Sequence, residues 1–167
     1  TGSHDLVVED VLVAKEWTFV RGEPSKLPEP FFKYPSLSLA TQVLTVVGIG
    51  VAAAALDEFK KLAPGKASIT GGAEIANRPV TQYEFAQVEA EFKAARTWFY
   101  ETMDAVWNEV VAGQKPTDEQ ISDMRLSCTH AARVAAKVTR KMQMLAGMTA
   151  IYTNNVFSRF VNDTNVV

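Results

Sequence analysis

ISDMRLSCTHAARVAAKVTRKMQML, residues 121–145, is the most regular stretch of the chain. Its apolar residues recur alternately three and four positions apart, and they are Ile121, Met124, Cys128, Ala131, Ala135, Val138, Met142 and Leu145. Such a seven-residue repeat forms one apolar stripe along a helix and is typical of packed helical bundles. Thr117 and Gln120 have the spacing of a capping box at the start of this helix, and Gly147 ends it. The pattern predicts a long helix over 117–146.

The flanking segments predict further helices on both sides of this one. Residues 79–113 carry apolar side chains from Phe85 to Val110 at helical spacing, with Pro79 suited to the first turn. An earlier helix is expected from Ser36 or Ser38, either of which can cap it, to about Leu62. Residues 155–167 predict the beginning of a fourth helix. The fold expected is mainly α, an up-and-down antiparallel four-helix bundle.

The first of these helices contains a stretch that also fits a membrane span. Residues 39–56 hold eighteen positions without a charge, at the lower edge of the length that crosses a bilayer. A helix that is apolar on every side is buried either in a membrane or in the middle of a bundle. Because the neighbouring segments are amphipathic and can cover it, we expect the bundle and no membrane.

The N-terminal part has a different character. Residues 5–14 alternate imperfectly between Val or Leu and acidic residues, which predicts a short strand, a β remnant ahead of the bundle. Four prolines between positions 22 and 35 then exclude both helix and strand, and predict a connector. The sequence therefore divides into residues 1–35 and a helical domain over 36–167.

The bulk composition excludes several classes of function. A net charge of −2 over 167 residues gives no electrostatic reason to expect nucleic acid or an anionic membrane as partner. Cys128 is the only cysteine, so no internal disulfide forms, and a reducing, cytoplasmic location is expected. His4 and His130 stand far apart, and no metal-binding, nucleotide-binding or hydrolase motif is present. No metal site is predicted.

Three stretches in order resemble flavoproteins of the acyl-CoA dehydrogenase fold. Residues 1–13, TGSHDLVVEDVLV, resemble the segment that ends the family's central β-domain, and residues 52–59, AAAALDEF, resemble the helix that opens its C-terminal domain. Residues 142–167, MQMLAGMTAIYTNNVFSRFVNDTNVV, resemble the family's closing pattern. The resemblance covers the whole chain but about two-fifths of a complete member. It implies that the chain is a fragment, that its opening letters are native, and that residues 1–35 end the β-domain and form a connector.

The family has two branches with different chemistry. Acyl-CoA dehydrogenases use FAD to desaturate an acyl-CoA, and usually carry an Arg-x-x-Phe-Gly pattern that residues 65–79, GKASITGGAEIANRP, lack. The hydroxylase branch oxygenates aromatic substrates with O₂ and reduced FMN or FAD, which a separate flavin reductase supplies. Residues 89–101, EAEFKAARTWFYE, resemble that branch. The resemblance favours the oxygenase component of a two-component monooxygenase, with an acyl-CoA dehydrogenase as the alternative. A non-catalytic helical interaction module is a second alternative, because an apolar seam can also serve a partner helix.

The resemblance assigns roles to a few residues. Ser3 matches a serine that approaches the flavin ring, and His4, its variable neighbour, is a candidate for substrate binding. The catalytic base of either branch is expected just beyond Val167.

A second set of assignments lies near the end of the 117–146 helix. Gln143, Ala146 and Gly147 match a Gln-x-x-Gly-Gly that meets a neighbouring subunit's flavin diphosphate, although Ala146 replaces the first glycine. Arg159 and Asp163 match a closing Arg and Asp, for which a structural salt bridge is expected.

The resemblance also implies a homo-oligomer, a dimer or a homotetramer with twofold symmetry. Trp98 and Trp107 lie outside the apolar stripe of the 79–113 helix, where large aromatic residues serve as interface anchors. Because most walls of the family's flavin pocket lie outside these residues, the isolated chain is expected not to bind flavin tightly. The basic residues Arg133, Lys137, Arg140 and Lys141 are interpreted as a solvated helix face, with phosphate binding as the alternative.

Overall fold

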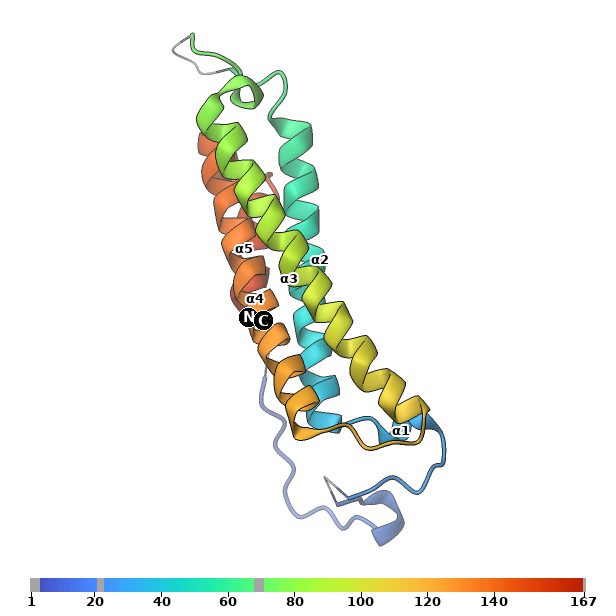
Figure 1. Ribbon diagram of the computed structural model, residues 1–167. Helices are drawn as coiled ribbons and strands as arrows, with labels where there is room; N and C mark the ends of the chain where they lie inside the picture. Colours follow the sequence, from blue (N-terminus) through green and yellow to red (C-terminus); the bar gives the residue numbers. More distant parts are fainter. Residues whose placement is uncertain (1–3, 21–22, 68–70, 167) are drawn as a thin grey trace.

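The computed structural model describes residues 4–20, 23–67 and 71–166. Their elements, in chain order, are η1 (Lys15–Trp17), α1 (Pro30–Lys33), α2 (Ser36–Leu62), η2 (Ile75–Asn77), α3 (Pro79–Val111), α4 (Asp118–Ala146), η3 (Gly147–Ile151) and α5 (Phe157–Val166). Helices α2, α3 and α4 run alternately up, down and up in Figure 1, and α5 runs beside α4. The expected antiparallel helical bundle is confirmed. We call the end with the α2–α3 loop the upper end and the end with the α3–α4 loop the lower end.

Helix α4 is the centre of the bundle, since it packs against α2, α3 and α5. Its seven-residue stripe is the buried face, with Ile121 and Leu145 partly buried and the positions between them buried. The capping box is present as predicted: Gln120 N donates to Thr117 Oγ1 over 3.1 Å, and Thr117 N donates to Gln120 Oε1 over 2.8 Å. These two bonds satisfy donors that the first turn of a helix leaves without partners.

The start of α2 differs from the sequence prediction. Pro35 is the residue before the first turn, and no side chain caps the helix, although Ser36 or Ser38 was expected to do so. Ser38 instead lies inside the helix and is buried. Pro35 occupies the N-cap position, and its carbonyl accepts the first helical hydrogen bond, from Leu39 N over 3.0 Å.

The β remnant expected over residues 5–14 is wrong. Within the described residues 4–20 no strand forms, and the segment is extended chain followed by the short turn η1. Leu6 and Leu12 are almost fully exposed. A strand is held by hydrogen bonds to a neighbouring strand, and the described part of the chain supplies no such neighbour. The described fold is therefore all helical.

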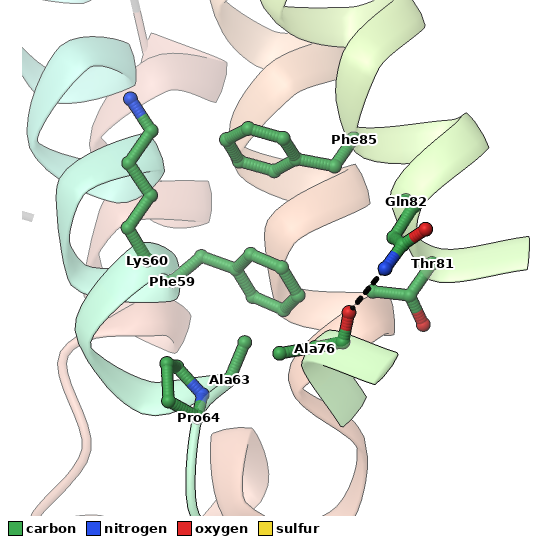
Figure 2. Close-up of a pocket in the computed structure, with 8 residues that line it drawn as sticks. All are labelled: Phe59, Lys60, Ala63, Pro64, Ala76, Thr81, Gln82 and Phe85. Atoms are coloured by element: carbon green, nitrogen blue, oxygen red, sulfur yellow. Dashed lines mark hydrogen bonds between the residues drawn. The ribbon is translucent and has the colours of Figure 1, made fainter. Parts of the chain in front are cut away.

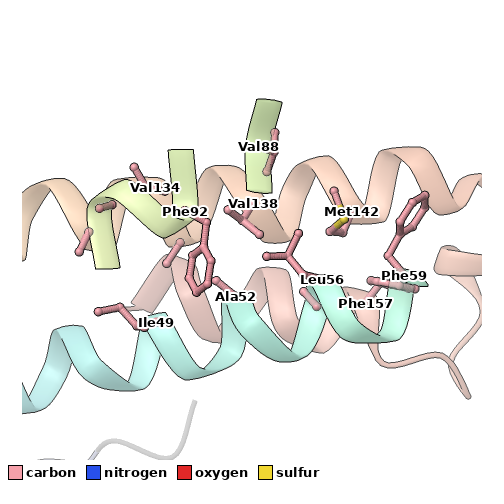
Figure 3. Close-up of a cluster of buried hydrophobic side chains, with 14 of the residues drawn as sticks. Ile49, Ala52, Leu56, Phe59, Val88, Phe92, Val134, Val138, Met142 and Phe157 are labelled. Atoms are coloured by element: carbon pink, nitrogen blue, oxygen red, sulfur yellow. The ribbon is translucent and has the colours of Figure 1, made fainter. Parts of the chain in front are cut away.

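The upper two thirds of the bundle hold an apolar core to which four helices contribute (Figure 3). Its larger members include Ile49, Leu56, Phe59, Val88, Phe92, Val134, Val138, Met142 and Phe157. Alanines at 52, 55, 131 and 135 are buried between them and allow α2 and α4 to approach closely, as the small residues of the stripe predicted. Burial of each large side chain stabilises the fold by about 1.5–3 kcal/mol.

The lower third of the bundle buries several polar side chains beside the apolar Val106, Val110 and Met124. The polar ones are Ser38, Gln42, Thr45, Thr102 and Ser127. Thr102 Oγ1 and Ser127 Oγ lie 2.7 Å apart and link α3 to α4. Thr45 Oγ1 donates to the carbonyl of Thr41 over 2.9 Å. Because the fully enclosed side-chain nitrogen and oxygen atoms have partners, hydrogen bonds offset the cost of burying this polar cluster.

Helix α2 is buried on one side only. By length and composition it could cross a membrane, yet it packs against α4 and α5 as a helix of the bundle. Its opposite side exposes Leu37, Val43, Leu44, Val46 and Val47, which are 40–60% accessible. We call these five residues the α2 face. No described residue covers it.

Candidate functional site

The C-terminal end of α4 carries the residues that the resemblance linked to flavin. Gln143 is partly buried, and its Nε2 donates to Ser158 Oγ of α5 over 3.2 Å. Ser158 Oγ in turn donates to the carbonyl of Ala150 over 2.9 Å. The amide of Gln143 is therefore held in a fixed orientation by two helices.

The next two candidates, Ala146 and Gly147, differ in conformation. Ala146 is helical, with φ −67° and ψ −18°, and its side chain is fully buried. Gly147 is exposed, with φ 64° and ψ −147°, a region that almost only glycine occupies. A Cβ there would meet no atom within 4 Å, so backbone conformation and not crowding requires glycine. The first glycine of the motif can thus be alanine, whereas the second cannot be replaced without strain.

Lys66, which sequence reasoning did not single out, lies over the same helix end. Its Nζ donates to the carbonyl of Ala146 over 3.3 Å, where the negative end of the α4 dipole favours a cation. Its own carbonyl accepts a hydrogen bond of 2.9 Å from Ile75 N. The α2–α3 loop is thereby tied to the end of α4. The sequence feature that could have identified Lys66 is its position directly after Pro64-Gly65, the pair that stops the preceding helix.

A pocket of about 210 Å³ opens beside this loop, between α2 and α3 (Figure 2). It is lined by Phe59, Lys60, Ala63, Pro64, Ala76, Thr81, Gln82 and Phe85. The rings of Phe59 and Phe85 are stacked with centroids 5.7 Å apart, and Lys60 Nζ lies 5.6 Å from the Phe85 centroid. The pocket is apolar with a cation at its rim. We call it the upper pocket.

These groups fit one part of a flavin cofactor. Lys66 and Gln143 supply an ammonium and an amide that can donate to a phosphate, whereas the Gly147 N–H donates to the Met144 carbonyl and the buried side chain of Ala146 cannot touch a ligand. The upper pocket is smaller than the roughly 300–1,000 Å³ typical of cofactor sites, so it cannot enclose a three-ring isoalloxazine. The described residues therefore offer an ammonium and an amide at this helix end, and they do not enclose a ring system.

Of the two N-terminal candidates, His4 alone is among the described residues, and it is not joined to this site. Ser3 lies outside the described residues, and His4 is exposed at the start of the extended segment. No hydrogen bond or ion pair among the described residues links His4 to Gln143 or Gly147. Arg159 and Asp163 form the expected salt bridge, an exposed pair with Nε and Oδ2 3.6 Å apart.

The basic residues of α4 form a solvated face, as interpreted from the sequence. Lys137 pairs with Glu91 and Lys141 with Glu84, each at 2.6 Å, while Arg140 Nη2 donates to Asn165 Oδ1 over 3.1 Å. These contacts connect α4 to α3 and α5. Within residues 4–20, 23–67 and 71–166, no group of three potential metal ligands comes together.

The buried thiol of Cys128 does not resemble a nucleophile. Burial raises its pKa, against the opposing effect of hydrogen bonds with Thr45 and Ser127. A thiol in this environment stays protonated near neutral pH and is inert. Trp98, expected at an interface, lies beside His130 with ring centroids 5.7 Å apart, and Trp107 lies near Tyr34 at 6.2 Å.

Comparison with known proteins places most of the chain in one family. Residues 42–167 match the family described as acyl-CoA dehydrogenase, C-terminal domain. Over all 167 residues the chain is 87% identical to an indole-3-acetate monooxygenase of Acinetobacter baumannii and 54% identical to an indole-3-acetate monooxygenase of Pseudomonas putida. It spans 43% of the length of each of these curated relatives.

Solved structures share the fold at low sequence identity. XiaF from Streptomyces sp., solved in complex with FADH₂ and glycerol, matches with a TM-score of 0.77 at 14% identity, over 83% of this chain and 35% of that one. The 3-HSA hydroxylase from Rhodococcus sp. RHA1 matches with a TM-score of 0.71 at 19% identity, over 82% and 34%. Both solved proteins therefore share the helical architecture of this chain.

Proposed function

The chain belongs to the family of acyl-CoA dehydrogenase C-terminal domains, and from that premise we propose that its full-length protein is a flavin-dependent monooxygenase. Its proposed role is the oxygenase component of a two-component system, and its proposed substrate is an aromatic acid of the indole-3-acetate type. The observation that carries the proposal is the 87% identity to an indole-3-acetate monooxygenase along the entire chain. A non-catalytic helical module does not account for this identity.

Reduced flavin is the proposed cofactor, as either FMN or FAD. When bound, it supplies the two electrons with which O₂ is activated for oxygenation. The complex of XiaF with FADH₂ supports a reduced flavin. In this chain we assign Lys66, Gln143 and Gly147 to the diphosphate or phosphate, with Ser158 holding the Gln143 amide in place. A separate flavin reductase is the proposed partner that delivers the reduced cofactor.

The remaining candidates keep their sequence-based roles as proposals. Ser3 is proposed to approach the flavin ring and His4 the substrate, while the catalytic base is proposed to follow Val167. Because the described residues enclose no ring system, we also expect the isolated chain to show no saturable flavin binding below about 1 μM, a threshold of about 8 kcal/mol. A cytoplasmic location is proposed on the ground that Cys128 is the only cysteine.

The test is a reaction with the full-length protein. Indole-3-acetate, O₂ and a reductase that generates reduced FMN or FAD are supplied, and oxygenated product is measured by mass spectrometry with ¹⁸O₂. We expect one atom of ¹⁸O in the product. The matched assay supplies an acyl-CoA with an artificial electron acceptor. Desaturation of the acyl-CoA without any response to reduced flavin would assign the protein to the dehydrogenase branch and overturn the proposal.

The diphosphate assignment has its own test. Lys66→Met is expected to weaken binding of reduced flavin several-fold, because it removes the ammonium at the α4 end. Lys61→Met, at an exposed lysine paired only with Glu58, is the matched control. Equal flavin affinity in the two variants would contradict the assignment of Lys66.

We further propose that the protein is a homo-oligomer, a dimer or tetramer, and that the α2 face is its main contact. The face is a continuous group of exposed apolar residues without a charge, and not a set of scattered ones. Burial of this face against the same face of an identical copy would stabilise the two subunits. Trp98 and Trp107, the interface anchors expected from the sequence, each lie beside an aromatic ring of their own chain, so the α2 face is the larger free apolar surface.

Sedimentation of the full-length protein tests the assembly. Leu44→Lys is expected to reduce the oligomer to a smaller species, since it introduces a charge into the middle of the α2 face. Leu126→Lys places the same charge at an exposed position of α4 and is expected to change nothing. An assembly that is indifferent to Leu44→Lys would show that another surface holds the subunits together.

A further inference from the structure

A second pocket lies at the lower end of the bundle, between α1, the start of α2 and the end of α3. Its volume is about 270 Å³, just below the range of roughly 300–1,000 Å³ typical of ligand sites, so it suits a ligand with a single ring. The lining residues are Phe31, Tyr34, Leu39, Gln42, Met103, Asp104 and Trp107. We call it the lower pocket. It shares no residue with the upper pocket or with the groups assigned to flavin.

Aromatic rings form much of its wall. The rings of Tyr34 and Trp107 have centroids 6.2 Å apart and are tilted by 49°, so they diverge and do not stack on one another. Phe31, which is 55% exposed, adds a third ring at the pocket's edge. Faces of such rings attract a cation placed within about 6 Å of their centroids. Several rings around one space are the usual way in which proteins hold organic cations.

A buried amide supplies a directional group. Gln42 is only 4% exposed, and its Nε2 donates to the Tyr34 hydroxyl over 2.7 Å and to Met124 Sδ. Within the described part of the chain no group donates to its Oε1. That oxygen is also not among the fully enclosed atoms, all of which have partners. Gln42 lines the pocket, and an amide oxygen that receives no hydrogen bond within the described chain can receive an N–H from a ligand.

The charge of the pocket selects the sign of a ligand. Asp104 contributes a carboxylate, and no described lysine, arginine or histidine forms an ion pair with it. None of the seven lining residues is basic. The charged lining residue of the upper pocket is Lys60, which pairs with Glu89 at 2.9 Å. The lower pocket therefore favours a cation and repels an anion.

The structure assigns to the lower pocket the binding of a small protonated primary amine that carries an apolar or aromatic body. An ammonium hydrogen is donated to Gln42 Oε1, the charge faces Asp104 and the rings of Tyr34 and Trp107, and the body rests on Leu39 and Met103. This site is independent of the proposed oxygenation, because an aromatic carboxylate is the charge type that Asp104 disfavours. An amine bound here occupies a place distinct from that of the substrate.

Calorimetric titration of the full-length protein with three probes tests this site. 2-Phenylethylamine, 2-phenylethanol and phenylacetate present a similar aromatic body with a positive, neutral and negative end. We expect the amine to bind most tightly and phenylacetate at least about tenfold more weakly, since cation–π contacts and the carboxylate favour only the amine.

Two variants and a control locate the binding. Asp104→Asn is expected to weaken amine binding about fivefold to tenfold and to leave 2-phenylethanol unchanged, since only the charge is removed. Trp107→Leu is expected to weaken the amine by a factor of about 2 to 30, the range of one cation–π contact. Lys60→Gln changes the upper pocket and is expected to have no effect on the amine.

Asp104 is exposed, so its substitution leaves the fold intact, and an unchanged melting temperature verifies this. The assignment is overturned if the amine does not bind at millimolar concentration or if phenylacetate binds equally well. It is also overturned if Lys60→Gln and Asp104→Asn reduce amine binding to the same extent. Competition between phenylethylamine and indole-3-acetate would place both ligands in one site and would contradict the separation proposed.

Discussion

The two ends of the bundle are built from the same three long helices but are held together differently. The upper end packs large apolar side chains such as Phe59, Phe92 and Phe157, with α5 covering the groove between α2 and α4. The lower end, which α5 does not reach, buries a hydrogen-bonded cluster that includes Gln42 and Thr102. Apolar packing stabilises the fold but does not depend on the relative orientation of the side chains. A buried hydrogen bond adds little net free energy, but a shift of one helix along its neighbour would leave the donor or acceptor without a partner and would destabilise the fold.

The difference indicates a division of labour within one fold. Large aromatic side chains are concentrated at the upper end, where the buried Thr139–Thr164 hydroxyl pair also links α4 to α5. At the lower end, hydroxyls and an amide link α2, α3 and α4. Both pockets have mainly apolar walls, and they differ in their charged lining residue, which is Lys60 in the upper pocket and Asp104 in the lower one. Substitutions at the two ends should therefore have effects of different size and kind.

The largest effect is expected at the upper end. Phe157→Ala removes a side chain that is 1% exposed and leaves a cavity between α2, α4 and α5, which should lower the free energy of unfolding by about 3–5 kcal/mol. Urea unfolding of the full-length protein measures it. Phe31→Ala, at a ring that is 55% exposed at the lower end, should cost far less. Equal losses for the two variants would break the comparison between the ends.

A smaller effect is expected for the buried pair at the lower end. Thr102→Val and Ser127→Ala each remove one hydroxyl of the 2.7 Å contact and should each destabilise by about 1–2 kcal/mol. The double variant should lose less than the sum, because neither hydroxyl is then left without its partner. A double-mutant cycle by urea unfolding gives the coupling. Strict additivity would mean that the hydroxyl pair does not link α3 to α4.

Tyr34 should make the lower end sensitive to alkaline pH. Burial raises its pKa, with the Gln42 hydrogen bond acting in the opposite direction and Cys128 adding to the rise. The phenol of the unfolded chain therefore loses its proton first. The contribution to stability is full below the unfolded pKa of about 10 and is lost as pH rises through the folded value. Melting temperatures between pH 9 and 11 should fall less steeply in Tyr34→Phe, while Tyr83→Phe, at an exposed ring, should retain the original slope.

The smallest effect is expected for the ion pairs on the outside of the upper end. Lys141→Met removes a 2.6 Å contact with Glu84 whose two side chains are 26% and 34% exposed. Such pairs contribute about 0.2–1 kcal/mol and weaken with added salt. The loss measured at low salt should shrink at 1 M NaCl. A salt-independent loss above 2 kcal/mol would show that charge, and not apolar packing, stabilises this end.

Most of the fold could be predicted from the sequence because the helical signals are strong and local. These signals act between residues that are close in the sequence: the stripe from Ile121 to Leu145, the Thr117 capping box, Pro79 at a helix start and Gly113 at a helix end. The strand predicted over residues 5–14 was wrong for the opposite reason. A strand depends on a partner that periodicity does not reveal, and none of the described residues provides it.

Less of the candidate site could be predicted. The residues near Gly147 were identified through the family resemblance, and their role in binding flavin stays a prediction. Lys66 was missed because its contact with the Ala146 carbonyl spans 80 residues of sequence. The lower pocket was missed because Gln42 lies in a run that reads as uniformly apolar, and Tyr34 and Trp107 meet only after folding. Long-range contacts of single side chains leave no periodic trace.

The position of α5 in the chain has a consequence for the order in which the protein is made. Phe157 follows Leu62 by 95 residues, so α2 leaves the ribosome well before the helix that closes its groove. At about 5–20 residues per second, the interval is roughly 5–20 s. During that time the apolar surface on which Phe157 packs and the α2 face are both exposed to solvent. The apolar side of α2 is therefore made well before the α5 helix that packs against it.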